Sequence, residues 1–184
     1  MRLALVRHPD SQGQAAAGVE VELAWPTRAT LALTYVVSGD VSGLLLPPPA
    51  PSARTDELWR HTCLEAFVGE VGKPGYCEIN LAPSGQWAAY RFSAYREAMR
   101  PALEVADPGI TLVAAADHFT LSGRLSFESA PDLAPAAVWR LALTAVIEQT
   151  DGAKSYWALA HPPGRADFHH DAGFTHLITA AERA

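Results

Sequence analysis

Lysine, cysteine and methionine are scarce in this chain of 184 residues, which contains two of each. Fourteen basic residues stand against twenty acidic ones, and the formal net charge is −6. A protein that binds a nucleic-acid duplex normally displays a basic face, so the composition predicts no nucleic-acid partner. No apolar run approaches the ~20 residues of a membrane span, so we expect no membrane partner either.

The first residues carry only a short apolar stretch, Leu3–Val6, which Arg7 ends. A secretory signal peptide needs an apolar core of ~7–15 residues, so we expect a cytoplasmic protein. In a reducing compartment Cys63 and Cys77 are expected to be buried free thiols, since they lack C-x-x-C spacing. A disulfide between them is the alternative, because both lie in neighbouring predicted strands.

Short β-like segments run through the whole chain, and no linker divides it, so a single domain over residues 1–184 is expected. Val19–Trp25 alternates apolar and polar residues with a period of two, which indicates a half-buried strand. Further strands are predicted at Thr30–Val37, Leu64–Val68, Tyr76–Leu81, Ile110–Ala115, His118–Phe127, Val138–Glu148, Tyr156–Ala160 and Phe174–Ile178. Short strands separated by Gly, Pro and Asp are typical of an all-β antiparallel sandwich or barrel.

Two segments fit both a helix and a strand. In Gln86–Met99 the pattern favours a strand as far as Phe92, followed by a short helical segment from Ala94. Val138–Thr150 is long and rich in alanine and leucine, but an amphipathic helix would carry more charge along one side, so a strand is favoured.

Glu65 lies within an otherwise apolar predicted strand. An ionised side chain there must face solvent, pair with a cation or meet a ligand. Glu78 and Asn80 alternate with apolar residues in the next strand, so a hairpin would bring Glu65 near them on one face. A solvated outer face is the simpler alternative. Glycoside hydrolases use a pair of carboxyl groups, so hydrolysis through Glu65 and Glu78 is a further alternative, although the sequence does not fix the distance between them.

Histidines gather near the end of the chain, where His161, Asp167 and His169 lie within nine residues. Such side chains could hold a transition metal, but their spacing matches no established zinc pattern. A loop whose histidines bond backbone groups is the favoured alternative, and we predict no metal and no cofactor. The chain also lacks the G-x-S-x-G nucleophile turn and a glycine-rich phosphate loop, so it offers no strong catalytic candidate.

Several aromatic residues lie close in sequence to polar groups: Trp59, Trp87, Tyr90, Tyr156 and Trp157. Aromatic rings beside carboxylates and amides suit a polyhydroxylated ligand, because the ring covers C–H edges while hydrogen bonds fix the hydroxyls. For each tryptophan taken alone, a place in the hydrophobic core is favoured.

Three runs carry a family resemblance: Asp56–Phe67, Tyr76–Trp87 and Tyr156–Gly164, the last followed by Asp167–His169. Together they resemble a bacterial DOMON-like group within the superfamily of family 9 carbohydrate-binding modules and of haem- or sugar-binding DOMON domains. The resemblance implies an antiparallel β-sandwich of jelly-roll type, with a ligand site on one concave face or its rim.

The resemblance also implies roles for individual residues. Sugar-binding members use stacked aromatics with acidic and amide partners, whereas haem-binding members use a methionine and a histidine. Met99 lies outside the matching runs, so a non-catalytic module for a soluble sugar or cell-wall precursor is favoured over haem binding. A hydrolase, or a domain that binds a partner protein without a small-molecule site, stays an alternative, and no oligomeric state is predicted. The predicted ligand-binding residues are Trp59, His61, Glu65, Glu78, Asn80, Trp157, His161, Asp167 and His169.

Overall fold

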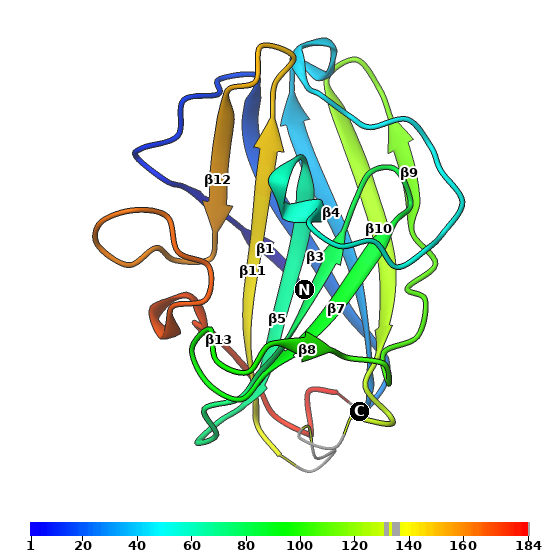
Figure 1. Cartoon of the computed structure of the whole chain (residues 1–184), viewed down its shortest axis with the longest axis vertical. Coiled ribbons are helices and arrows are strands. Elements are labelled where there is room, and N and C mark those ends of the chain that lie inside the picture. Colours follow the sequence, from blue (N-terminus) through cyan, green and yellow to red (C-terminus); the bar gives the residue numbers. More distant parts are fainter. Residues whose placement is uncertain (131–132, 134–136, 184) are drawn as a thin grey trace.

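Two antiparallel β-sheets face each other in the computed structural model, which describes residues 1–130, 133 and 137–183 (Figure 1). The smaller sheet has the strand order β1-β3-β4-β10-β9. Its strands are β1 (Arg2–Ala4), β3 (Ala16–Thr27), β4 (Thr30–Gly39), β9 (Thr111–Ala114) and β10 (His118–Ser126).

The larger sheet has the order β2-β12-β11-β5-β6-β7-β8, and β13 pairs with the first residues of β11. Its strands are β2 (Val6–Arg7), β5 (Cys63–Glu70), β6 (Tyr76–Leu81), β7 (Trp87–Phe92), β8 (Arg100–Pro101), β11 (Trp139–Glu148), β12 (Lys154–Ala158) and β13 (His176–Ile178). This architecture is the predicted antiparallel β-sandwich.

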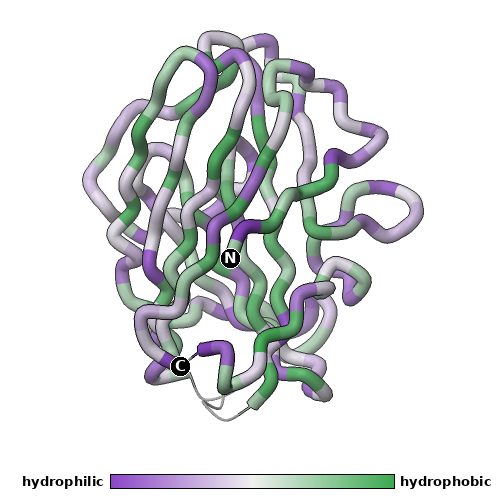
Figure 2. The backbone as a smooth tube through the Cα atoms, turned by 180° about the vertical axis from the view of Figure 1, so that it is seen from behind, coloured by the Kyte–Doolittle hydropathy of each residue, from purple (hydrophilic) through white to green (hydrophobic). Residues whose placement is uncertain are grey.

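The core lies between the sheets, and the period of two along each strand builds it. In β5, Leu64, Ala66 and Val68 pack in the core, whereas Glu65 and Phe67 face the outer side of the larger sheet. Figure 2 shows the resulting alternation of hydrophobic and hydrophilic residues along the strands. The outer face of the larger sheet is itself largely apolar around Phe67, which sets it apart from an ordinary solvated face.

Most predicted strands are confirmed, including Val138–Glu148, which forms β11 rather than a helix. The strand ending at Phe92 is also confirmed, but the helical segment expected from Ala94 is wrong. Glu97 donates its backbone N–H to the Ala94 carbonyl at 3.1 Å, which closes a tight turn, and Arg96 has a φ of 55°. The helical elements of the described residues are three 3₁₀ turns: η1 (Val41–Gly43), η2 (Leu58–Arg60) and η3 (Asp171–Gly173).

Both cysteines are buried free thiols, and the disulfide alternative is wrong. Cys77 in β6 lies opposite Val68, which is five positions along β5 from Cys63. A disulfide needs Cα atoms within ~7 Å, and strand positions so far apart cannot meet that requirement.

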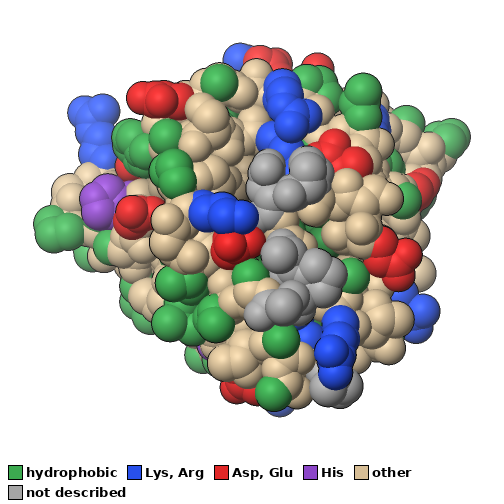
Figure 3. Space-filling view, turned by 90° about the horizontal axis from the view of Figure 1, so that it is seen from below, with side chains coloured by type: hydrophobic (Ala, Val, Ile, Leu, Met, Phe, Trp, Pro, Cys, Tyr) green, Lys and Arg blue, Asp and Glu red, His purple; other side chains and the backbone are tan. Residues whose placement is uncertain are grey.

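The end of the sandwich near the C-terminus carries acidic and basic side chains side by side, as Figure 3 shows from below. The Arg183 guanidinium lies 4.0 Å from the ring centroid of Trp139 and donates to the carbonyls of Ile178 and Ala137. This contact fixes the last residues against the core. Within the described part of the chain, no helix has the length and apolar character that crossing a membrane requires.

Candidate functional site

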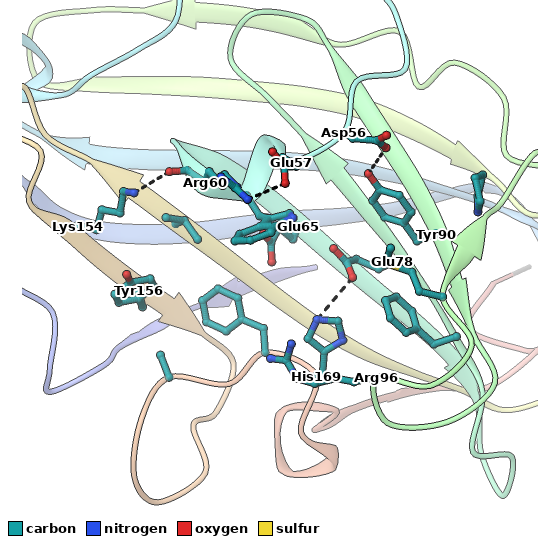
Figure 4. Close-up of a pocket in the computed structure, with 17 residues that line it drawn as sticks. Asp56, Glu57, Arg60, Glu65, Glu78, Tyr90, Arg96, Lys154, Tyr156 and His169 are labelled. Atoms are coloured by element: carbon teal, nitrogen blue, oxygen red, sulfur yellow. Dashed lines mark hydrogen bonds and ion pairs between the residues drawn. The ribbon is translucent and has the colours of Figure 1, made fainter.

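A cleft of about 1050 Å³ lies on the outer face of the larger sheet. It extends across β5, β6, β7, β11 and β12, and η2 and the loop after β12 contribute to its walls. Figure 4 shows how side chains from these elements converge on it. The lining residues used below are Asp56, Glu57, Trp59, Arg60, Glu65, Glu78, Tyr90, Phe92, Arg96, Met99, Lys154, Tyr156, Phe168 and His169.

Two glutamates form the floor of the cleft. Glu65 pairs with Asn80 across the β5–β6 ladder, so Glu78 lies on the same face two residues away, as the predicted hairpin required. Glu65 is only 2% exposed and Glu78 only 6%. The Thr144 hydroxyl donates to Glu65 Oε2 at 2.8 Å, and the Asn80 amide donates to Glu78 Oε1 at 2.7 Å. The floor is therefore a built carboxyl pair rather than a solvated face.

Burial dominates the electrostatics of this pair. It raises the pKa of Glu65 to about 8, with a further contribution from the charge of Glu78, while the Thr144 hydrogen bond acts in the opposite direction. Burial also raises the pKa of Glu78, against the lowering effects of the Asn80 hydrogen bond and the Arg96 charge. At neutral pH the pair therefore retains a proton and can both donate and accept hydrogen bonds.

His169 closes one side of the floor as a neutral imidazole. Burial, followed by the Arg96 charge, lowers its pKa to about 4. The Tyr76 hydroxyl oxygen accepts the Arg96 backbone N–H at 3.1 Å and lies 2.8 Å from His169 Nδ1. His169 Nε2 lies 3.7 Å from Glu78 Oε2, so the imidazole stands between the Tyr76 hydroxyl and the carboxyl pair.

Aromatic side chains form the walls above the floor. Tyr90 and Phe92 come from β7, Tyr156 from β12 and Phe168 from the loop that follows β12. The Tyr90 hydroxyl donates to Asp56 Oδ1 at 2.6 Å. Rings beside hydrogen-bonding groups let one surface contact both the apolar and the polar sides of a ligand.

Three cations lie around the rim, and each already has a carboxylate partner. Arg60 pairs with Glu57 at 2.7 Å, Arg96 with Asp167 at 2.8 Å and Lys154 with Glu148 at 3.8 Å. The Arg96–Asp167 pair also connects the turn after β7 to the loop after β12, and the Tyr95 hydroxyl donates to Asp167 as well. The rim charges thus balance one another.

The structure brings together six of the nine predicted site residues. Trp59, Glu65, Glu78 and His169 line the cleft, while Asn80 and Asp167 hold Glu78 and Arg96 from behind.

The other three predicted residues lie outside the cleft. Trp157 is in the core between the sheets, where its indole N–H donates to Ser155. His61 lies beside η2 and contacts Glu148 at 2.7 Å. His161 Nε2 contacts the Val6 carbonyl, as expected for a loop histidine.

Sequence reasoning did not select Asp56, Phe92, Arg96, Lys154 or Phe168 as site residues. Asp56 and Phe168 lie inside the runs that carry the resemblance, and that position was the available signal. Arg96 and Lys154 carry no local signal, because they reach the cleft only through the sheet order that brings β7 and β12 to opposite sides of it.

Donor side chains in and near the cleft bear on the metal and haem alternatives. Within the described residues, no group of three or more His, Cys, Asp or Glu side chains is arranged to hold a metal ion. Met99 and His169 both line the cleft, as a haem ligand pair would. His169 Nδ1 is hydrogen-bonded to the Tyr76 hydroxyl and Nε2 lies 3.7 Å from Glu78 Oε2, so a haem iron would have to displace one of these contacts.

Solved structures with a similar fold include the following proteins. A proposed carbohydrate-binding protein from Bacteroides uniformis superposes with a TM-score of 0.68 at 15% identity, over 95% of this chain and 84% of its own. The fold resembles that of family 9 carbohydrate-binding modules. A family 9 module from Caldicellulosiruptor kristjanssonii in complex with glucose has a TM-score of 0.50 at 10% identity, over 84% of this chain and 72% of its own.

The family 9 module in complex with cellotriose gives a TM-score of 0.50 at 9% identity, over 87% of this chain and 74% of its own. No family model matches the sequence, and no curated protein does. At these sequence identities, the likeness shows a shared fold. The DOMON-like resemblance and the cytoplasmic location stay predictions.

Proposed function

We propose that this protein is a non-catalytic binding module for a small carbohydrate in the cleft on the larger sheet. One observation carries the proposal: the buried Glu65–Glu78 pair, fixed by Thr144 and Asn80, lies beneath aromatic walls. A pair that retains a proton offers both a donor and acceptors, which matches the two-way hydrogen bonding of sugar hydroxyls. The aromatic walls supply surfaces for the C–H edges of a sugar ring.

The size of the cleft and the fold support this proposal. Ligand pockets occupy roughly 300–1,000 Å³, and a volume of about 1050 Å³ therefore accommodates more than one sugar ring. The structural neighbours include family 9 modules in complex with glucose and cellotriose. A soluble sugar or a cell-wall precursor is the ligand class that we propose.

Trp59 provides the first test, because it lines the cleft while 48% exposed and no core packing depends on it. We expect Trp59→Ala to weaken binding of glucose or cellobiose about fivefold to tenfold, since a stacking contact contributes about 1 kcal/mol. Isothermal titration calorimetry measures the effect. Leu103→Ala is the matched control, because Leu103 is an exposed apolar residue outside the cleft and its loss should leave affinity unchanged.

The same protein preparation separates the alternatives. A Soret band in the absorption spectrum, lost in His169→Ala, would replace the sugar proposal with haem binding. Turnover of a chromogenic glycoside that disappears in both Glu65→Gln and Glu78→Gln would instead make the cleft an active site, and would contradict the non-catalytic assignment.

A further inference from the structure

Among the residues that the structure describes, three carboxyl groups face the cleft without an ion pair to lysine or arginine. Within the described residues, Asp56, Glu65 and Glu78 form no ion pair with any lysine or arginine side chain, because the rim cations are engaged elsewhere. Each carboxyl group is bonded instead by a neutral donor: the Tyr90 hydroxyl, the Thr144 hydroxyl and the Asn80 amide, respectively. The histidine that faces Glu78 is neutral as well.

This arrangement leaves an excess of negative charge at the floor of the cleft. A buried carboxylate without a counter-charge is costly, and in the free protein the floor reduces that cost by keeping a proton. A positive charge delivered by a ligand would remove the cost more effectively, because it would permit both glutamates to ionise and would bond to them directly.

The walls are also suited to a cation. The rings of Tyr90, Phe92, Tyr156 and Phe168 line the same cleft as the carboxyl pair. Aromatic rings attract a cation placed over their faces, and the attraction is stronger where water is excluded. Carboxylates below and rings around are the surroundings that a desolvated ammonium group requires.

We infer that the cleft selects sugars carrying a free primary amino group, which enters as an ammonium ion and lies against Glu65 and Glu78. The inference rests on the proposed function and narrows its ligand class to amino sugars. An N-acetylated sugar brings no charge and places a carbonyl oxygen near the carboxyl pair. An anionic sugar is repelled by the negative charge at the floor. We therefore expect N-acetylated and anionic sugars to bind more weakly than amino sugars.

Three disaccharides with the same linkage test the inference: the β-1,4 dimer of glucosamine, its di-N-acetyl form and cellobiose. Calorimetric titrations are performed at pH 6.5 and 150 mM salt, where long-range attraction to the net negative protein is screened. We expect the free amine to bind at least tenfold more tightly than the other two. Glu78→Gln, which keeps the shape of the floor, is expected to remove this preference.

Glu22→Gln is the matched control, because Glu22 is an exposed glutamate on β3 of the smaller sheet, outside the cleft, where it pairs with Arg2. This variant should keep the preference for the amine. Equal affinity for all three disaccharides would overturn the inference while leaving carbohydrate binding intact. Binding of none of them would overturn both proposals. A preference for the amine that persists in Glu78→Gln would show that Glu78 does not bind the ammonium group, and would overturn the inference.

Discussion

The protein is expected to lose stability as the pH rises from 6.5 to 8, and Glu65→Gln is expected to remove most of that loss. The pKa of Glu65 is raised to about 8 by burial, above the ordinary value of 4.5 that applies after unfolding. Between these values the folded protein binds more protons than the unfolded chain, so its free energy of unfolding falls with pH. The slope reaches at most about 1.4 kcal/mol per pH unit for one group.

Histidines give the opposite slope at lower pH. Burial lowers the pKa of His169 to about 4, and lowers those of His161 and His176. Below pH 6.5 the unfolded chain therefore binds more protons at these histidines, and their contribution to stability rises with pH. Below pH 6.5 the histidine and carboxyl effects oppose each other, so the clearest fall in stability is expected as the pH rises from 6.5 to 8, where the histidines become neutral in both states.

Urea unfolding at pH 5, 6.5 and 8 measures this profile for the unmodified protein and for Glu65→Gln. The glutamine keeps an oxygen for the Thr144 hydrogen bond, so the variant should fold and should differ mainly in its slope above pH 6.5. Glu57→Gln, which changes an exposed carboxylate, should reproduce the unmodified profile. Equal stability of the unmodified protein at pH 6.5 and pH 8 would contradict a raised pKa at Glu65.

Trp139→Ala is expected to lower the free energy of unfolding by about 3–5 kcal/mol, the usual cost of removing a buried tryptophan. Trp139 is fully buried, contacts the rings of Trp25 and Phe127, and lies under the Arg183 guanidinium. The substitution leaves a cavity and removes the ring on which that guanidinium rests. Unfolding in urea, followed by far-ultraviolet circular dichroism, measures the loss.

Trp59→Ala makes the same chemical change at an exposed position. It should alter stability by less than about 0.5 kcal/mol, as surface substitutions usually do, while it weakens ligand binding. Comparable stability losses in the two variants would mean that Trp59 is part of the core, and would remove it from the proposed site.

The shared face of Glu65, Glu78 and Asn80 could be predicted from the sequence because strand geometry is local. A side-chain period of two and a short β5–β6 connection place Glu65, Glu78 and Asn80 on one face whatever surrounds them. The same alternation predicted the sandwich and most of its strands. The helical segment expected from Ala94 was wrong. In β7, Trp87 and Ala89 pack in the core, whereas Tyr90 and Phe92 are buried on the outer face. A strand buried on both faces can have apolar residues at the same spacing as a helix.

Tryptophan roles could not be predicted, because core and site tryptophans have similar neighbours in sequence. The order of the sheets decided that Trp157 faces the core and that Trp59 stands exposed on η2.

The sequence by itself determined an all-β sandwich and a shared face for Glu65, Glu78 and Asn80, since these follow from alternation within neighbouring strands. Only the tertiary structure decided that the two glutamates form the floor of an aromatic cleft, that Arg96 and Lys154 stand at its rim, and that their charges are engaged by Asp167 and Glu148. The physical reason is that burial and charge balance depend on segments distant in sequence, and these meet only when the sheets and the loop after β12 are in place.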